Sequence, residues 1–566
     1  MTDSARQVLD QFFNSYYRLR PVNATFTGVH AHDHALPDWS PEGLEVAEGE
    51  MRARRAALRP AIAAAPRRYP EQVDLELADA FLEIQLAEIE GPHFQRGNPS
   101  LHVGEAIFGV LSLVTRDFAP FEARLEKVTS RLLAVPRLLA DGRRTLGSRP
   151  IPSAWTARAL RECQGALVFL RHGLERWLAH GSLTRSGRVL AETSLDAARE
   201  AGRQAQDSVG QFVAWLTSGA TVSEESGCAC GPELFDLLLA RGHWCRRSRA
   251  ELLGEAKDAF EAARAALDER ARRHAAGGWA DVQAQLASEH PAPERYLASF
   301  QETWDACRRV AQEHDLVTWP DYPIRYVPIP EWTRDAAPYL YYLSYRSPAP
   351  FDRLDVHDYL VTPLTPGMTA EEQQRVLRAN NNSVIKLNHV VHHGAIGHHV
   401  QNFYACRSAS RIGQIAAVDC ASRIAMFSGG TVAEGWACYA TDLMDEAGFL
   451  TPLEQVSERH SRVRQLARAI VDIELHQGTM SLERASAFYH ERAGMAEAAA
   501  RAEACKNSMF PGAAVMYWLG KDAIHRLRAE QSTRGGASFS LGRFHDRFLA
   551  FGAIPALLIA ELWDQV

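Results

Sequence analysis

Five histidines lie within eleven residues of one segment, and so dense a tract indicates metal binding. Residues 388–401 read Asn-His-Val-Val-His-His-Gly-Ala-Ile-Gly-His-His-Val-Gln, and the histidines are His389, His392, His393, His398 and His399. The whole chain has 22 histidines in 566 residues, so this density is far above chance. Neutral imidazole is the commonest metal ligand in proteins. We therefore expect a metal centre in this segment.

Helical spacing is compatible with two pairs of these histidines as ligands. His389 and His393 are four residues apart and share a helix face, as in a two-histidine zinc helix. His392 and His399 are seven residues apart and also share a face. Either pair would point its two rings to the same side of a regular helix.

A third pair requires a break in the helix. His392 and His398 are six residues apart and point in different directions on an ideal helix. Gly394 and Gly397 lie between them, and glycine permits a kink or bulge that would bring the two rings together. Spacing alone does not choose among the three pairs.

Glu434 is a candidate carboxylate ligand from a later helix. It lies in the segment TVAEGWACYATDLMDE at 431–446, where Trp436, Tyr439 and Leu443 form an apolar stripe at helical spacing. A carboxylate in so apolar a setting needs a partner if it is buried, and a metal ion would supply one. Two histidines and this glutamate would form a His-His-Glu set with an open position for water or substrate.

The elements that must position these residues are predicted to be mostly helices. Three- and four-residue spacing of apolar residues predicts helices over 75–89, 121–139, 187–219 and 249–275. Alternating strand patterns are scarce, and the best strand candidate is 324–329. We expect a large, mostly α-helical fold with few short strands, built around a central cleft.

The chain divides into three predicted parts that need not be independent domains. These are an N-terminal helical half at 1–315, a mixed connector rich in Pro and Tyr at 316–380, and a C-terminal helical half with the metal site at 381–566. Proline punctuation predicts irregular structure between Pro320 and Pro350. Tyr345 closes an aromatic run there and is a candidate for lining a substrate cleft. The passage 221–231, rich in Gly, Ser and Cys, is predicted to be a loop.

The composition of the chain indicates where the protein is located in the cell and which classes of partner it binds. Lys plus Arg number 62 and Asp plus Glu 69, a formal charge of −7, so no basic patch indicates nucleic acid. Nine scattered cysteines are typical of reduced cytosolic thiols. The first residues lack a basic segment followed by an apolar run, and no apolar stretch reaches membrane-spanning length. We expect a cytoplasmic protein with no membrane partner; the oligomeric state stays open.

The chain resembles the bacterial domain-of-unknown-function family 885, which is related to zinc metallopeptidases. The family core HEAIPGHHLQ followed by EGWALYAE corresponds to HHGAIGHHVQ at 392–401 and EGWACYAT at 434–441. Further motifs extend the resemblance over nearly the whole chain, namely PVNATFTGVHAHDHALPDWS at 21–40, VDIELHQG at 471–478, FPGAAVMYWLG at 510–520 and FHDRFLAFGAIP at 544–555.

The resemblance implies a zinc-peptidase helix pair and a specific set of site residues. The implied ligands are His392, His398 and Glu434, with His399 as the main alternative and His389 as another. His476, Tyr517 and His545 fall at motif positions, where they would orient substrate or stabilise a developing oxyanion. Lys506 stands where the family has an arginine and is a candidate substrate-binding residue.

Several departures fall where the chemistry of the family is expected. His393 replaces the family glutamate that would act as general base. Ile396 replaces a proline, and Asn507 follows Lys506 where a tyrosine is expected; Ala513 and Trp518 replace a glutamine and a lysine. His393 has a pKa range suited to a base at neutral pH, or it can be a further ligand.

These features predict a metal-dependent hydrolase. It would use metal-activated water on a small amide, ester or peptide-like substrate, with His393 as base and one divalent ion, zinc first and iron second. A non-hydrolytic metalloenzyme, such as a lyase, an isomerase or an oxygen-using enzyme, is the first alternative. A non-catalytic scaffold of the same fold is the second.

Overall fold

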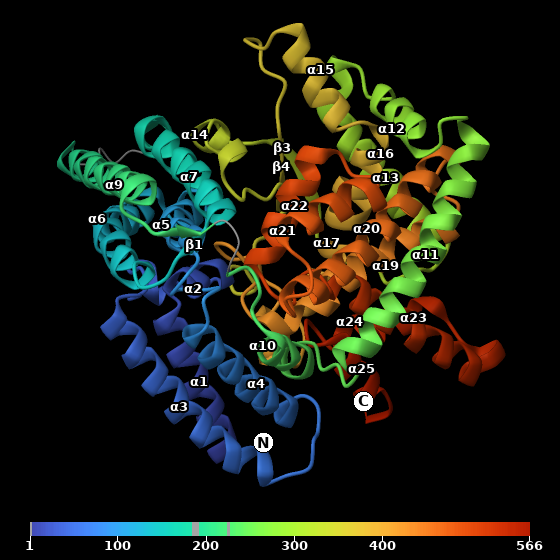
Figure 1. Ribbon diagram of the computed structural model, residues 1–566, viewed down its shortest axis with the longest axis horizontal. Helices are drawn as coiled ribbons and strands as arrows, with labels where there is room; N and C mark the ends of the chain where they lie inside the picture. The colour runs from blue at the N-terminus through green and yellow to red at the C-terminus, as the bar shows by residue number, and fades with distance from the viewer. Residues whose placement is uncertain (1–2, 184–191, 224–226, 566) are drawn as a thin grey trace.

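The computed structural model describes residues 3–183, 192–223 and 227–565 and confirms a mostly α-helical protein (Figure 1). Within these ranges there are four short strands in two parallel pairs. β1 (Ile151–Pro152) pairs with β2 (Val222–Ser223). β3 (Ile324–Pro328) pairs with β4 (His357–Val361), with Ile324 opposite His357.

The helices up to residue 218 form two groups on one side of the molecule, coloured blue and teal in Figure 1. The helices are α1 (Asp3–Leu19), α2 (Pro21–Thr27), α3 (Pro41–Ala63), α4 (Glu71–Glu90), α5 (Pro99–Val114), α6 (Phe121–Leu146), α7 (Ser153–Val168), α8 (Leu174–Leu183) and α9 (Glu192–Ser218). Helices α3 and α4 pack together, and α6 packs on both α5 and α9.

The rest of the chain surrounds the centre of the molecule. Its middle part contains α10 (Pro232–Leu237), α11 (Arg249–His274), α12 (Trp279–Ser288), α13 (Tyr296–Glu313), α14 (Glu331–Arg334), α15 (Ala370–Ala379) and α16 (Asn382–Val384). The C-terminal part contains the π-helix η6 (Ile385–Gly394), then α17 (His398–Ala405), α18 (Arg411–Ile415), α19 (Gly430–Glu446), α20 (Pro452–His476), α21 (Leu482–Ala487), α22 (Glu497–Met509), α23 (Met516–Gly535), α24 (Leu541–Ala550) and α25 (Ala556–Leu562).

Short 3-10 and π turns complete the secondary structure. The 3-10 turns are η1 (His30–His32), η4 (Pro293–Arg295), η5 (Ala337–Tyr339), η7 (Phe427–Gly429), η9 (Gly536–Ser538) and η10 (Trp563–Gln565). The π turns are η2 (Phe169–Gly173), η3 (Leu238–Gly242) and η8 (Phe488–Arg492). None of the helices described is long and apolar enough to cross a membrane.

The predicted elements agree well with the observed ones. The helices expected at 75–89, 121–139 and 249–275 correspond to α4, α6 and α11, and the strand at 324–329 to β3. The helix expected at 187–219 is α9 from residue 192 to 218; its residues 187–191 lie outside the described ranges. The loop predicted at 221–231 contains the two residues of β2, and its residues 224–226 also lie outside the described ranges.

Three buried hydrophobic clusters form the core, and each draws on distant parts of the chain. The first contains Phe12 from the N-terminal helices and Phe548 from α24. The second contains Trp155 and reaches Met509, and the third joins Phe235 to α20 and α23. The predicted division at 315 and 380 therefore does not coincide with separate cores, although the division itself stays a prediction.

Candidate metal centre

A break in the chain between η6 and α17 brings two of the predicted ligands together. Ala395 (φ −128°, ψ −117°) and Gly397 (φ −73°, ψ −120°) leave the helical conformation between the two elements. A Cβ at Gly397 would collide with the carbonyl oxygen of His392, so only glycine allows this close turn. The turn places the rings of His392 and His398 with their centroids 4.9 Å apart.

Three histidines, rather than two, meet at this point. One ligand atom from each of His392, His393 and His398 lies within 4.8 Å of the others. The Nδ1–H of His393 donates to the carbonyl oxygen of Asn388 at 2.7 Å. Since a neutral imidazole carries one proton, this bond leaves the Nε2 lone pair of His393 available.

Glu434 on α19 completes the cluster. Its Oε2 lies 3.5 Å from the Nε2 of His392 and 3.7 Å from the Nε2 of His398. This oxygen is buried and has no hydrogen-bond partner among the described residues. A buried carboxylate oxygen beside three imidazoles, with no donor of its own, is suited to a cation.

Two contacts hold α19 in register with the histidine turn. The indole Nε1–H of Trp436 donates to the carbonyl oxygen of Ile396 at 2.8 Å. On the other side, Gly435 packs against the backbone of Gly520 on α23, where a Cβ would lie 2.5 Å from the Gly520 carbonyl carbon. The motif Glu434-Gly435-Trp436 therefore positions the carboxylate through a close helix contact and a hydrogen bond.

The cluster shares protons unequally. Burial would lower the pKa of His392, but the neighbouring Cys438 thiol and Glu434 carboxylate raise it to about 9. Burial lowers the pKa of His398 to about 4 and holds that of His393 well below its usual range. Burial would raise the pKa of Glu434, but His392 and then His398 lower it far below its usual range. The site thus contains an ionised carboxylate and two neutral imidazoles, and a metal ion would displace the proton on His392.

The two alternative ligands point away from the cluster. His389 donates from Nε2 to Asn380 Oδ1 at 2.9 Å and accepts at Nδ1 from the Tyr359 hydroxyl at 2.6 Å. His399 donates from Nε2 to the carbonyl oxygen of Tyr322 at 2.7 Å and stacks on the Tyr322 ring. Neither histidine belongs to the cluster of three.

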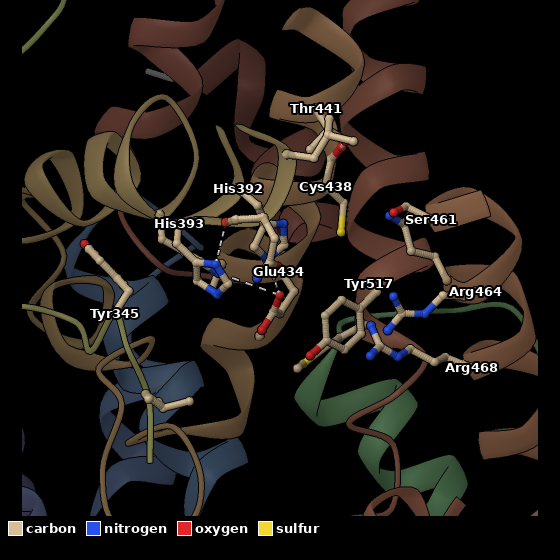
Figure 2. Close-up of a pocket in the computed structure, with 18 of the residues that line it drawn as sticks. Tyr345, His392, His393, Glu434, Cys438, Thr441, Ser461, Arg464, Arg468 and Tyr517 are labelled. Carbon is tan, nitrogen blue, oxygen red and sulfur yellow. Dashed lines mark hydrogen bonds and ion pairs between the residues drawn. The ribbon is translucent and has the colours of Figure 1, made fainter. Parts of the chain in front are cut away.

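The cluster lies at the wall of a cavity of about 480 Å³. Figure 2 shows His392, His393 and Glu434 on one side of it, with Tyr517, Arg464 and Arg468 on the other. Tyr345 and Lys506, both predicted to bind substrate, also line this cavity. The Tyr345 ring lies nearly parallel to that of His398 at 6.2 Å, and its hydroxyl accepts from Asn402.

His476 and His545 are placed differently from the expectation of a substrate-facing role. Both are fully buried and do not line this cavity. His476 donates from Nε2 to the carbonyl oxygen of Asn507 at 2.9 Å. His545 donates from Nδ1 to the carbonyl oxygen of Leu316 and accepts at Nε2 from the Tyr439 hydroxyl. These hydrogen bonds connect separate segments of the fold, and neither residue is part of the proposed site.

Arg464, Arg468 and Cys438 are among the residues of the cavity wall that were not predicted from the sequence. Arg464 and Arg468 are four residues apart on α20, and Cys438 lies one turn after Glu434 on α19. In the sequence the two arginines are a pair of cations at helical spacing, in a stretch whose other residues are largely apolar. This pattern predicts that they share a helix face, but not that the face meets a cavity. The signal for Cys438 is its position on the same helix face as Glu434.

Fold and site together define a large helical protein with a candidate metal centre at a central cavity. The chain belongs to the family described as bacterial protein of unknown function, DUF885, whose model matches residues 21–562. The sequence resemblance to this family is thus confirmed.

Solved structures share the fold over the full length. One is described as "a putative lipoprotein of unknown function" from Shewanella oneidensis, with 21% identity, a TM-score of 0.74 and coverage of 99% of each chain. Another is described as "the putative lipoprotein" from Colwellia psychrerythraea, with 17% identity, a TM-score of 0.72 and coverage of 99% of this chain and 98% of that one. No curated protein matches the chain. At these identities the likeness concerns the fold alone.

Proposed function

We propose that this protein is a metal-dependent hydrolase with a zinc-metallopeptidase-like core, acting on a small amide, ester or peptide-like substrate. The observation that carries the proposal is the meeting of three imidazoles and one carboxylate at the wall of a cavity large enough for such a substrate. The predicted cytoplasmic location and a small molecule, rather than nucleic acid or membrane, as partner belong to the same proposal.

The donor set suits one divalent ion. His392, His398 and Glu434 would hold it. The ion would give the buried Oε2 of Glu434, which has no hydrogen-bond partner among the described residues, a positive charge to bind. Two histidines and one glutamate match a catalytic zinc set, and iron is the second choice. When bound, the ion would supply Lewis-acid activation of water and of the substrate carbonyl.

His393 would take the place of the glutamate base. Its Nδ1–H bond to Asn388 fixes the ring and leaves the Nε2 lone pair as the atom that would accept a proton from water. Tyr517 lines the opposite wall, from which its hydroxyl would donate to a substrate oxygen that gains negative charge. Tyr345 would shape the cleft beside His398.

A second candidate follows from the position of His393. Its ligand atom lies within 4.8 Å of those of His392 and His398. If His393 is a ligand, it cannot act as the base, and three histidines and a carboxylate would suit iron as well as zinc. The proposed chemistry is then non-hydrolytic, by a lyase, an isomerase or an oxygen-using enzyme.

Turnover measurements with loaded protein test the first proposal against the second. Zinc-loaded wild type is assayed with a panel of N-acyl amino acids, dipeptides and aryl esters, with and without a chelator. We expect hydrolysis that the chelator abolishes and zinc restores, and at least a hundredfold lower kcat in His393→Ala with zinc retained. Zinc lost from His393→Ala would favour the second candidate; no hydrolysis by the zinc-loaded protein would contradict the first.

A further inference from the structure

The wall opposite the histidine cluster carries positive charge that the protein does not neutralise. Arg464, Arg468 and Lys506 all line the cavity, from α20 and α22. Of these, Arg468 forms an ion pair with Glu503 at 2.7 Å. Three cations thus surround one carboxylate. Burial would raise the pKa of Glu503, but Arg468, Lys506 and Arg464 hold it at about 2.

Arg464 has no partner of its own among the described residues. Its Nε is buried and makes no hydrogen bond, and only longer-range charges act on its guanidinium. Lys506 is similar, since its ammonium group lies over the Tyr341 ring at 5.4 Å and makes no ion pair with a described carboxylate. Arg464 and Lys506 are half-buried, share the one carboxylate of Glu503 with Arg468 and form no ion pair of their own with a described residue. Such cations are better compensated when an anion binds them.

Two other carboxylates of the cavity wall are engaged elsewhere, and a third, Glu434, lies in the histidine cluster. Glu458 is paired with Arg459 and Arg462, at 2.5 Å in each case. Asp419 accepts from the backbone and hydroxyl of Ser347 at 3.0 and 2.8 Å. Their bonding capacity is engaged elsewhere, so the excess charge of the basic wall faces the cavity.

We propose that Arg464 and Lys506 form an anion-binding subsite, and that the substrate of this cavity carries a carboxylate or a phosphate there while its reacting bond lies at the histidine cluster. Arginine binds both groups in a planar, two-pronged manner, and lysine adds a point charge. The Arg468 guanidinium lies over the Tyr517 ring at 4.4 Å. These two residues would line the cavity between the anion subsite and the histidine cluster. The anion subsite does not depend on the proposed function. Only the statement that the bound anion is part of the hydrolysed substrate rests on it.

Binding of matched ligands tests the subsite without turnover. Isothermal titration calorimetry on the metal-loaded protein would use ligands without a hydrolysable bond, and would compare 3-phenylpropanoate with 3-phenylpropanol and phenylphosphonate with benzyl alcohol. We expect at least one anion to bind tenfold or more tightly than its neutral partner. The 3-phenylpropanoate arm identifies a carboxylate site and the phenylphosphonate arm a phosphate site. Equal affinity of both anions and their neutral partners would overturn the proposal.

Variants at Arg464 attribute the binding to this wall. Arg464→Gln should lose the tenfold preference, and Arg464→Lys should retain most of it. Arg501→Gln removes an exposed arginine of α22 that pairs with Glu497, and it should bind as wild type does. Unchanged anion affinity in a folded Arg464→Gln protein, with the melting temperature of wild type, would overturn the proposal.

Metal content separates failure of the subsite from failure of the proposed function. Arg464-dependent anion binding by a protein that takes up no metal would sustain the subsite and end the hydrolase proposal. Conversely, the protein could hydrolyse neutral substrates in a chelator-sensitive reaction whose rate is the same in wild type and Arg464→Gln. That result would support the hydrolase proposal and contradict the anion subsite.

Discussion

Trp436 donates its indole N–H to the carbonyl oxygen of Ile396, and so bonds the helix that carries Glu434 to the turn that carries His398. The bond is buried and spans forty residues of sequence. It links the two segments that supply the candidate ligands. We expect it to determine how well the carboxylate meets the histidines.

Trp436→Phe should therefore weaken both stability and metal binding. The buried Ile396 carbonyl loses its indole donor, at a cost of about 1–3 kcal/mol in the free energy of unfolding. Trp332→Phe is a matched control, because it removes an indole bond to Val114 outside the site. Urea unfolding and metal titration would check both variants. If the two bind metal equally well, the bond does not position the ligands.

Gly397→Ala should disrupt the site through the backbone. The added Cβ would collide with the His392 carbonyl oxygen, and the turn between η6 and α17 must open to avoid it. Gly210→Ala, on α9 with open space around it, should instead raise stability by about 0.5–1 kcal/mol. Metal affinity and melting temperature would be compared. A Gly397→Ala protein that binds metal like wild type would show that the close turn is dispensable.

The stability of the N-terminal part should depend on pH through His30. Burial opposes its protonation, but bonds of 2.8 Å to Asp33 and to Asp352 raise its pKa to about 9. The folded value lies above the unfolded value of about 6.5, so this stabilisation is complete below pH 6.5 and is lost as pH rises through 9.

His30→Gln should accordingly cost about 2 kcal/mol at pH 6 and much less at pH 9.5. Denaturant unfolding at the two pH values measures the difference. His34→Gln, at an exposed neighbouring position, should show no such trend. A cost of His30→Gln that is the same at both pH values would refute the assignment.

Much of the fold could be predicted from the sequence, because helical periodicity is a local signal. The helices predicted at 75–89, 121–139 and 249–275 are all present, although α4 begins four residues earlier and α6 ends seven residues later than predicted. The histidine tract and Glu434 likewise identified the region of the candidate site. What periodicity could not supply was the relative placement of helices that are distant in sequence.

The choice among the histidines depended on the backbone and on distant residues. The conformations of Ala395 and Gly397 turn His398 toward His392. An argument from helical spacing assumes a continuous helix and so does not predict such a break. His389 is withdrawn by Asn380 and Tyr359, and His399 by Tyr322. Arg464 was missed because no local signal shows which face of α20 meets the cavity.

His393 separates the two chemical proposals most clearly. As a base it should be replaceable by glutamate, the residue that the family has at this position, with hydrolysis retained in His393→Glu and lost in His393→Ala. As a ligand it should control metal affinity in both variants. Rates and metal content of the same preparations would decide, and equal hydrolysis by His393→Ala and wild type would exclude the base role.

The most direct test of the account is the metal content of the purified protein, measured by elemental mass spectrometry. We expect about one equivalent of zinc or iron in wild type, lost in His392→Ala and Glu434→Ala. His389→Gln should keep it, because both ring nitrogens of His389 are bonded elsewhere. Wild-type protein that takes up no metal even when supplied with it, or metal that persists in both ligand variants, would contradict the central claim.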